Sequence, residues 1–70
     1  MERQYVTSSN LRSVGYSAEE RILEIEFVNG TLYEYYEVPE SEYQYLIQAS
    51  SCGRYFNMNI RDSYEHNQLR

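Results

Sequence analysis

The sequence predicts an α+β domain, in which a three-stranded antiparallel β-meander is followed by two α-helices packed on the sheet. Residues 22–28 alternate apolar and charged side chains and lead into Asn29-Gly30, which is a strong hairpin signal. Residues 43–50 then place Tyr43, Leu46 and Ile47 on one helical face. A run of strands followed by a run of helices is typical of the α+β class.

The first strand is expected over residues 11–16, with an irregularity around Gly15. We read residues 1–4 as a frayed end and residues 5–9 as an extended segment. Ser8, Ser9 and Asn10 are typical of turns closed by local side-chain to backbone bonds, and they could also contribute polar contacts to a ligand. A polar turn then leads into the second strand at residue 22.

The length of the hairpin loop decides which face of the third strand, residues 31–38, carries Tyr33 and Tyr35. A two-residue loop would place Glu34 on the apolar face. A three-residue loop that ends at a left-handed Gly30 instead turns the strand glutamates outward. We favour this register, and it predicts that both tyrosines share the face of the apolar residues in the second strand.

Two helices complete the predicted fold. Pro39 ends the third strand and suits a helix entry, so the first helix is expected from there to about Ser50. Residues 51–53 are expected to break it. A second helix is predicted over residues 54–64, and the closing residues 66–70 are expected to fray.

Length and composition limit the classes of protein. Seventy residues predict a single domain over residues 1–70, with a core at about 6–64 and frayed ends. One cysteine cannot form an internal disulfide, and neither an apolar membrane span nor a signal-peptide core is found. We therefore expect a cytoplasmic protein with no membrane association, no cofactor and no small-molecule substrate.

Charge is distributed unevenly along the chain. The net charge is −5, and residues 19–42 hold eight glutamates against Arg21. All six cations are arginines, which suit planar contacts to phosphate or carboxylate where they cluster. The overall field repels polyanions, so nucleic-acid binding requires a local basic patch.

Several short motifs add up to a family resemblance. They are Ser8-Ser9-Asn10-Leu11, Gly15-Tyr16, the LEIEF strand with its Gly30 turn, Tyr33-Glu34-Tyr35, Val38-Pro39, and Ser51-Cys52-Gly53-Arg54-Tyr55-Phe56. In order and spacing they resemble the KTSC domain over about residues 6–64. That family is marked by a central Tyr-x-Tyr and is named for the C-terminal domain of some lysyl-tRNA synthetases. The resemblance implies an association with tRNA and assigns no molecular activity.

Two groups of residues are candidate binding sites. Tyr33 and Tyr35 could stack on unpaired bases, although the favoured register makes packing in the core their main role. A second group could bind nucleic acid or another anion, with amides at the start of the second helix adding to it: Arg12, Ser51, Arg54, Tyr55, Asn57 and Arg61. Alternatively, these arginines are a solvated face that pairs with the sheet glutamates.

Residues with reactive or metal-binding side chains are too few to predict chemistry. Cys52 precedes Arg54 near a helix start, but no orienting acid or base accompanies it. Asp62 and His66 are four residues apart, whereas a metal site needs three or four ligands. We therefore expect no enzyme activity and no metal.

The sequence leaves two classes of function open. One is a non-catalytic binding module for tRNA or structured RNA, and the alternative is a protein-protein interaction module with an arginine and tyrosine interface and an acidic sheet face. Clustering of Arg12, Arg54 and Arg61 would favour RNA. Their pairing with sheet glutamates, beside an exposed apolar patch, would favour a protein partner.

Overall fold

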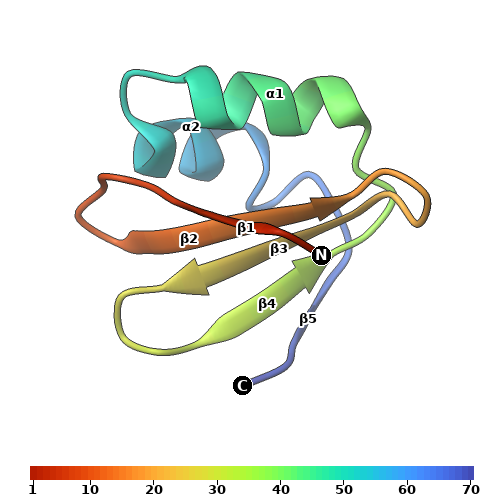
Figure 1. The fold of residues 1–70 in the computed structure, drawn as a ribbon, viewed down its shortest axis with the longest axis horizontal. Helices are drawn as coiled ribbons and strands as arrows, with labels where there is room; N and C mark the ends of the chain where they lie inside the picture. Colours follow the sequence, from red (N-terminus) through yellow and green to blue (C-terminus); the bar gives the residue numbers. More distant parts are fainter.

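Two helices cover one face of a five-stranded antiparallel sheet, and the other face is turned to solvent (Figure 1). This computed structural model describes all 70 residues. The elements in chain order are β1 (Arg3–Tyr5), β2 (Leu11–Ser17), β3 (Ile22–Phe27), β4 (Leu32–Tyr35), α1 (Glu40–Gln48), α2 (Cys52–Asn59) and β5 (His66–Gln68).

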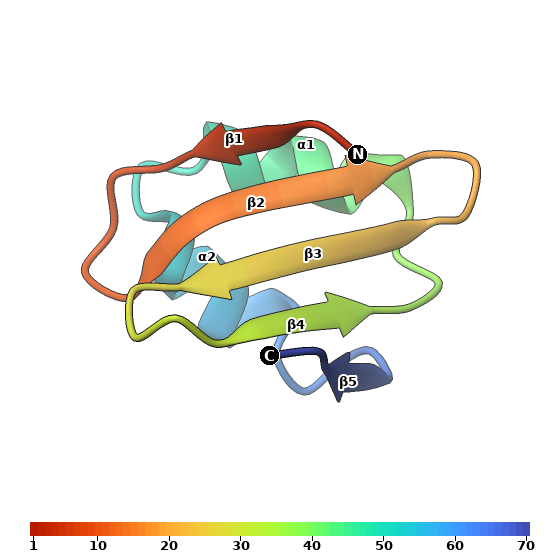
Figure 2. The same ribbon diagram turned by 60° about the horizontal axis from the view of Figure 1, so that its bottom comes forward.

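The strands lie in the sheet in their chain order, from β1 at one edge to β5 at the other (Figure 2). The α+β class and the two helices on an antiparallel sheet are confirmed, but the prediction of three strands is wrong. Arg3 pairs with Gly15, and His66 pairs with Tyr35, so both segments expected to fray are edge strands. All residues of β1 and β5 are exposed, and no apolar alternation marks them in the sequence.

The hairpin between β3 and β4 has the register that the charge pattern favoured. Ile25 lies opposite Tyr33, and Leu23 lies opposite Tyr35. The Phe27 amide donates to the Thr31 carbonyl at 2.9 Å, which closes the three-residue loop. Gly30 has a φ of +94°, a conformation that glycine adopts at low cost.

The irregularity in β2 falls between Leu11 and Ser13, and not around Gly15 as predicted. Arg12 is the extra residue, since Leu11 lies opposite Phe27 while Ser13 lies opposite Glu26. The bulge lets Leu11 point into the core and leaves the Arg12 side chain exposed.

Both helices differ from their predicted bounds. The helix α1 stops at Gln48, two residues before Ser50. Cys52 and Gly53 do not separate the helices as predicted but form the first turn of α2. The Ser51 hydroxyl accepts the Arg54 amide and caps that turn. The helix α2 ends at Asn59, so Tyr64 lies beyond it.

The core lies between the sheet and the helices. Val14, Leu23, Ile25, Val38, Leu46 and Ile60 are fully buried there. The strand β4 ends at Tyr35, and Glu37, with a φ of +56°, precedes the fully buried Val38. Neither helix has the length or the apolar character that crossing a membrane requires.

Candidate functional site

An open groove lies between the β3–β4 hairpin and the C-terminal half of α2, with a volume of about 480 Å³. We call it the aromatic groove, because four rings from the strands and α2 line it. Its residues are Asn10, Phe27, Asn29, Thr31, Tyr33, Tyr35, Phe56, Asn57, Arg61, Asp62 and His66. An open site with aromatic walls and a few polar groups is a general form of ligand site.

The rings of the groove support one another. Phe27 contacts Tyr33 edge to face, with ring centroids 5.6 Å apart and planes at 89°. Phe56 contacts Phe27 at 5.6 Å and Tyr35 at 5.4 Å, also with steeply inclined planes. Such contacts add to the free energy of burial and fix the rings in place. The aromatic wall is therefore formed before any ligand arrives.

Tyr33 and Tyr35 share the helix-facing side of the sheet, as the register predicts. Tyr35 is 3% exposed and belongs to the core, whereas Tyr33 is half-buried. The Tyr33 hydroxyl donates to Gln68 Oε1 at 3.1 Å. Both tyrosines also line the aromatic groove, so packing and access to a ligand coexist in these two side chains.

The Tyr35 hydroxyl makes no hydrogen bond within the protein, although its ring is buried. Burial, followed by the nearby Tyr33, raises the pKa of Tyr35 to about 12. Arg61 opposes this rise in pKa and Asp62 adds to it, so both charges lie close enough to affect the hydroxyl. The Tyr35 phenol therefore keeps its proton at neutral pH and can donate it to a ligand.

The strand β5 brings His66 to the groove. Its ring centroid lies 5.1 Å from that of Tyr35 and 6.0 Å from that of Tyr33. His66 Nδ1 is 3.3 Å from the Tyr64 carbonyl oxygen, which fixes the ring orientation. Sequence reasoning considered His66 only as a metal ligand beside Asp62, because β5 carries no signal that would place it next to Tyr35.

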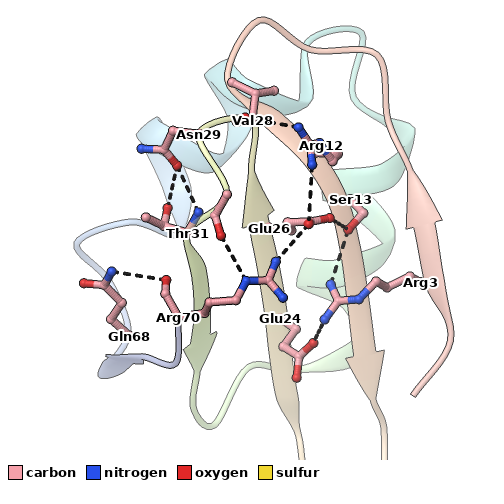
Figure 3. Close-up of polar contacts among 11 residues, drawn as sticks. Arg3, Arg12, Ser13, Glu24, Glu26, Val28, Asn29, Thr31, Gln68 and Arg70 are labelled. Atoms are coloured by element: carbon pink, nitrogen blue, oxygen red, sulfur yellow. Dashed lines mark hydrogen bonds and ion pairs between the residues drawn. The ribbon is translucent and has the colours of Figure 1, made fainter.

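The predicted arginine and tyrosine surface is divided by the fold. Arg12 lies on the outer face of the sheet, where it donates to the Val28 carbonyl at 3.2 Å and pairs with Glu26 at 3.8 Å (Figure 3). Of the other five predicted residues, only Asn57 and Arg61 line the aromatic groove.

The remaining three residues of that surface have other contacts. The Ser51 hydroxyl accepts the Arg54 amide at 3.3 Å and is thereby used as a cap. The Tyr55 hydroxyl donates to the Glu42 carboxylate. Arg54 is exposed, and like Arg61 it makes no ion pair. Of these two arginines only Arg61 lines the groove, and it is free to meet an anion there.

The turn before β2 packs against the start of α2. Ser8 Oγ accepts the amides of Asn10 and Leu11, both at 3.3 Å, which is the turn chemistry expected from the sequence. A Cβ built on Gly53 would lie 2.9 Å from Ser8 Oγ and still closer to Asn10 Oδ1. The protein's own polar side chains therefore pack against the helix start that the sequence offered as one possible phosphate site.

The residues considered for other chemistry are dispersed. Cys52 is 7% exposed, and its Sγ lies 3.9 Å from the Ala49 carbonyl oxygen. Asp62 and His66 both line the groove, but they come from a turn and a strand and do not share a helical face. No group of three or more potential metal-binding side chains is found in the chain.

Sequence reasoning missed most of the aromatic groove. The hairpin register was a signal for Phe27 and Thr31, because it aligns both with Tyr33 on one face. Phe56 was recognised only as an apolar helix residue. Asn10, named from the sequence as a possible ligand contact, does line the groove, whereas Asn29 belongs to a turn whose contacts across the fold no local pattern reveals.

Comparison with known proteins now identifies the family. The model of the KTSC domain matches residues 7–64, which confirms the resemblance seen in the sequence motifs. The chain belongs to the KTSC domain family. A solved structure of a KTSC domain protein from Yersinia pestis superposes with a TM-score of 0.92 at 37% identity, covering 99% of this chain and 97% of that one.

Two relatives show where KTSC domains occur. An uncharacterized protein of Stutzerimonas stutzeri is 51% identical over 64 residues, which cover 91% of this chain and 90% of the relative. A lysine-tRNA ligase of Nostoc punctiforme is 36% identical over 61 residues, which cover 87% of this chain and 11% of the ligase. KTSC sequences are therefore found both in small proteins and as a minor part of a tRNA ligase.

Proposed function

We propose that this KTSC domain is a non-catalytic accessory module that binds tRNA or structured RNA, with an unpaired stretch of the RNA in the aromatic groove. The observation that carries the proposal is the groove itself, where aromatic rings lie beside amide side chains and beside the unpaired Arg61. Unpaired bases bind proteins through stacking on aromatic rings and hydrogen bonds to their edges.

The distribution of charge supports binding on this side of the molecule. Arg3, Arg12 and Arg70 form ion pairs with Glu24 and Glu26 on the outer face of the sheet (Figure 3). Arg61 lines the groove, makes no ion pair and remains available to a phosphate. With a net charge of −5, we expect weak binding that depends strongly on salt.

The relatives give a second line of support. The lysine-tRNA ligase that is similar to this chain over 61 residues is, as its name states, an enzyme that acts on tRNA. An appended module that contacts an unpaired part of the tRNA would add to the affinity of such an enzyme through its effective concentration. The proposal places the present protein in the cytoplasm, with RNA as its partner.

A titration of isotopically labelled protein tests the proposal. Bulk tRNA and a mixed single-stranded RNA are added at low and at physiological salt while the backbone amide signals are followed. We expect salt-sensitive shifts around Tyr33, Tyr35 and residues 54–62. If no signal moves at low salt, where electrostatic binding is strongest, the proposal is wrong.

Two matched variants locate the binding surface. Arg61→Gln removes a free charge from the groove, and Arg12→Gln removes the same charge from the outer face. We expect Arg61→Gln to weaken RNA binding by about threefold to tenfold, while Arg12→Gln leaves it close to that of the parent. Equal losses in both variants would contradict a binding site in the groove.

A second candidate function is a protein-interaction module. The pairing of Arg12 with Glu26 favours it, as do Tyr45 and Met58 on the two helices, which are 61% and 73% exposed. In this case RNA would leave the spectrum unchanged, and partner capture from cell extract would recover a protein whose binding Met58→Ser weakens.

A further inference from the structure

We infer, on the basis of the proposed RNA binding, that the aromatic groove is a site for one unstacked guanine nucleotide. In this site the Tyr35 hydroxyl and the Asp62 carboxylate read the edge of the base, and Arg61 meets its phosphate.

The first observation is the unused hydroxyl of Tyr35. The residue is 97% buried, since only 3% of it is exposed, yet its hydroxyl has no partner in the protein, and the residue lines the groove. The hydroxyls of Tyr16 and Tyr33, in contrast, donate to protein oxygens at 2.6 and 3.1 Å. No buried side-chain oxygen in this protein lacks a hydrogen-bond partner, so the unpartnered Tyr35 hydroxyl opens to the groove, where it can meet a polar atom of a ligand.

The second observation is the pair of charges beside that hydroxyl. Arg61 and Asp62 both line the groove, and neither forms an ion pair. Asp62 offers two acceptor oxygens, the neutral Tyr35 phenol offers a donor, and Arg61 offers several donors. The groove therefore presents a donor and a double acceptor as well as a cationic side chain.

This pattern matches guanine among the four RNA bases. The Watson–Crick edge of guanine carries one acceptor, O6, followed by two adjacent donors, N1–H and the N2 amino group. Cytosine and adenine present acceptors where Asp62 would need donors, and uracil presents only a single N–H between two carbonyls. A carboxylate with two acceptor oxygens would therefore favour guanine and repel the other bases.

The size and walls of the groove fit one nucleotide. A volume of about 480 Å³ lies within the range of small-ligand sites. The half-buried ring of Tyr33 stands edge to face with Phe27 and stacks with Tyr35, and its exposed surface can support the flat face of a base. Arg61 suits the phosphate, since a guanidinium binds its oxygens in a bidentate manner.

The assignment also reconciles RNA binding with the acidic character of the domain. An acidic residue beside RNA is unfavourable when it faces phosphates but favourable when it accepts hydrogen bonds from a base. Asp62 is in this sense a specificity residue, and its charge selects guanine at the expense of general affinity for polyanions.

Mononucleotides test the site directly. Labelled full-length protein is titrated with GMP, AMP, CMP and UMP, and with a short oligouridine RNA that has either guanosine or adenosine at its centre. We expect GMP and the guanosine RNA to shift the amide signals around Tyr33, Tyr35 and Asp62, with at least about tenfold preference over each competitor.

Variants separate recognition of the base from folding. Tyr35→Phe removes the hydroxyl and keeps the ring, so we expect weaker GMP binding with no loss of stability, since the hydroxyl has no partner in the protein. Asp62→Asn places an amide donor at the base edge, and we expect it to abolish the preference for guanine. Arg12→Gln on the outer face is the control and retains that preference.

The outcomes distinguish this inference from the proposed function. RNA binding with equal affinity for the four nucleotides, unaffected by Asp62→Asn, would overturn the guanine site and leave RNA binding in place. An absence of shifts with every RNA and nucleotide at low salt would overturn both.

Discussion

Gly53 lies where the turn before β2 closely approaches the start of α2. It occupies the first turn of α2, and the side chains of Ser8 and Asn10 cover the space that a Cβ would need. The Ser8 hydroxyl donates to Asn10 Oδ1 at 3.1 Å and accepts the backbone amides of Asn10 and Leu11. Ser8 and Asn10 cannot move away without losing these bonds.

We expect Gly53→Ala to destabilise the protein by about 1–3 kcal/mol, the usual cost of an added atom in a filled space. Helix propensity alone predicts the opposite, a gain of about 0.8–1.0 kcal/mol for alanine. The change in the free energy of unfolding, measured by urea denaturation, therefore distinguishes the two expectations by its sign. In the matched background Asn10→Ala, which opens the space, the added alanine should cost less. An increase in stability in the parent background would contradict the close approach.

From the sequence, Gly53 was predicted to break the helix, because its contact with Ser8 and Asn10 depends on residues far away in the chain. Glycine is unfavourable within helices, and only the arrival of residues 8–10 from the other end of the fold explains its place there. The local turn chemistry of Ser8 and Asn10 was predictable, because it depends on residues that are adjacent in the chain.

At the scale of elements, Glu42 ties the two helices to the segment that follows them. Its carboxylate in the first turn of α1 accepts the Tyr55 hydroxyl from α2 and the Tyr64 hydroxyl at 2.9 Å. Burial, followed by the hydrogen bonds to Glu42, raises the pKa of both tyrosines to about 12. The helix layer thus depends on a polar contact as well as on the apolar core.

We expect Glu42→Gln to lower the free energy of unfolding by about 1–2 kcal/mol, because hydrogen bonds to a charged acceptor become neutral ones. The pKa of Tyr55 and of Tyr64 should also fall, which a tyrosinate absorbance titration measures. Glu40→Gln changes the neighbouring first-turn glutamate, which accepts no side-chain hydrogen bond, and is the control. If both variants were equally stable, the carboxylate would not tie the helices together.

The strands show where prediction from sequence succeeds and where it fails. The β3–β4 register was predictable because a shift of one residue would move Glu34 to the apolar face. The edge strands β1 and β5 were not, because each has only three exposed residues and depends on the free edge of a neighbouring strand. The aromatic groove shares this limit, since Tyr33 and Tyr35 could be placed but His66 on β5 could not.

At the scale of the whole molecule, folding neutralises the acidic middle segment on one face. Arg3, Arg12 and Arg70 come from distant parts of the chain and meet Glu24 and Glu26 on the outer face (Figure 3). The excess of glutamate in residues 19–42 is visible in the sequence. The partners of these glutamates could not be predicted, because they depend on which strands lie side by side.

This arrangement predicts how stability responds to acid. A hydrogen bond of 2.8 Å from the Ser13 hydroxyl, aided by the nearby arginines, lowers the pKa of Glu26. A depressed carboxyl pKa adds stability at pH values above the unfolded pKa, and this contribution is lost as the pH falls through the folded pKa.

We therefore expect Glu26→Gln to reduce stability at neutral pH and to flatten its decline in acid. Thermal denaturation from neutral pH down to below the ordinary glutamate pKa of about 4.3 measures both effects. Glu19→Gln in the exposed turn is the control. If the stability of Glu26→Gln fell with decreasing pH as steeply as that of the parent, this role for Glu26 would be contradicted.

Alkaline pH should destabilise the whole fold through its tyrosines. The pKa of Tyr35, of Tyr55 and of Tyr64 is raised to about 12 in the folded protein, chiefly by burial, against about 10 in an unfolded chain. Between these two values the unfolded chain releases protons that the folded protein retains. The unfolded state then binds fewer protons, so the free energy of unfolding falls as the pH rises.

We expect the midpoint of urea denaturation to fall steadily from about pH 10 towards pH 12, the window that these pKa values define. Tyr35→Phe removes one titrating group from the core and should make the decline shallower. Tyr5→Phe, whose parent ring is 74% exposed, is the matched control and should leave the decline unchanged. A midpoint independent of pH in this window would show that the three phenols ionise as readily in the folded protein as in the unfolded chain. The Tyr35 hydroxyl would then not be the protonated donor on which recognition in the aromatic groove depends.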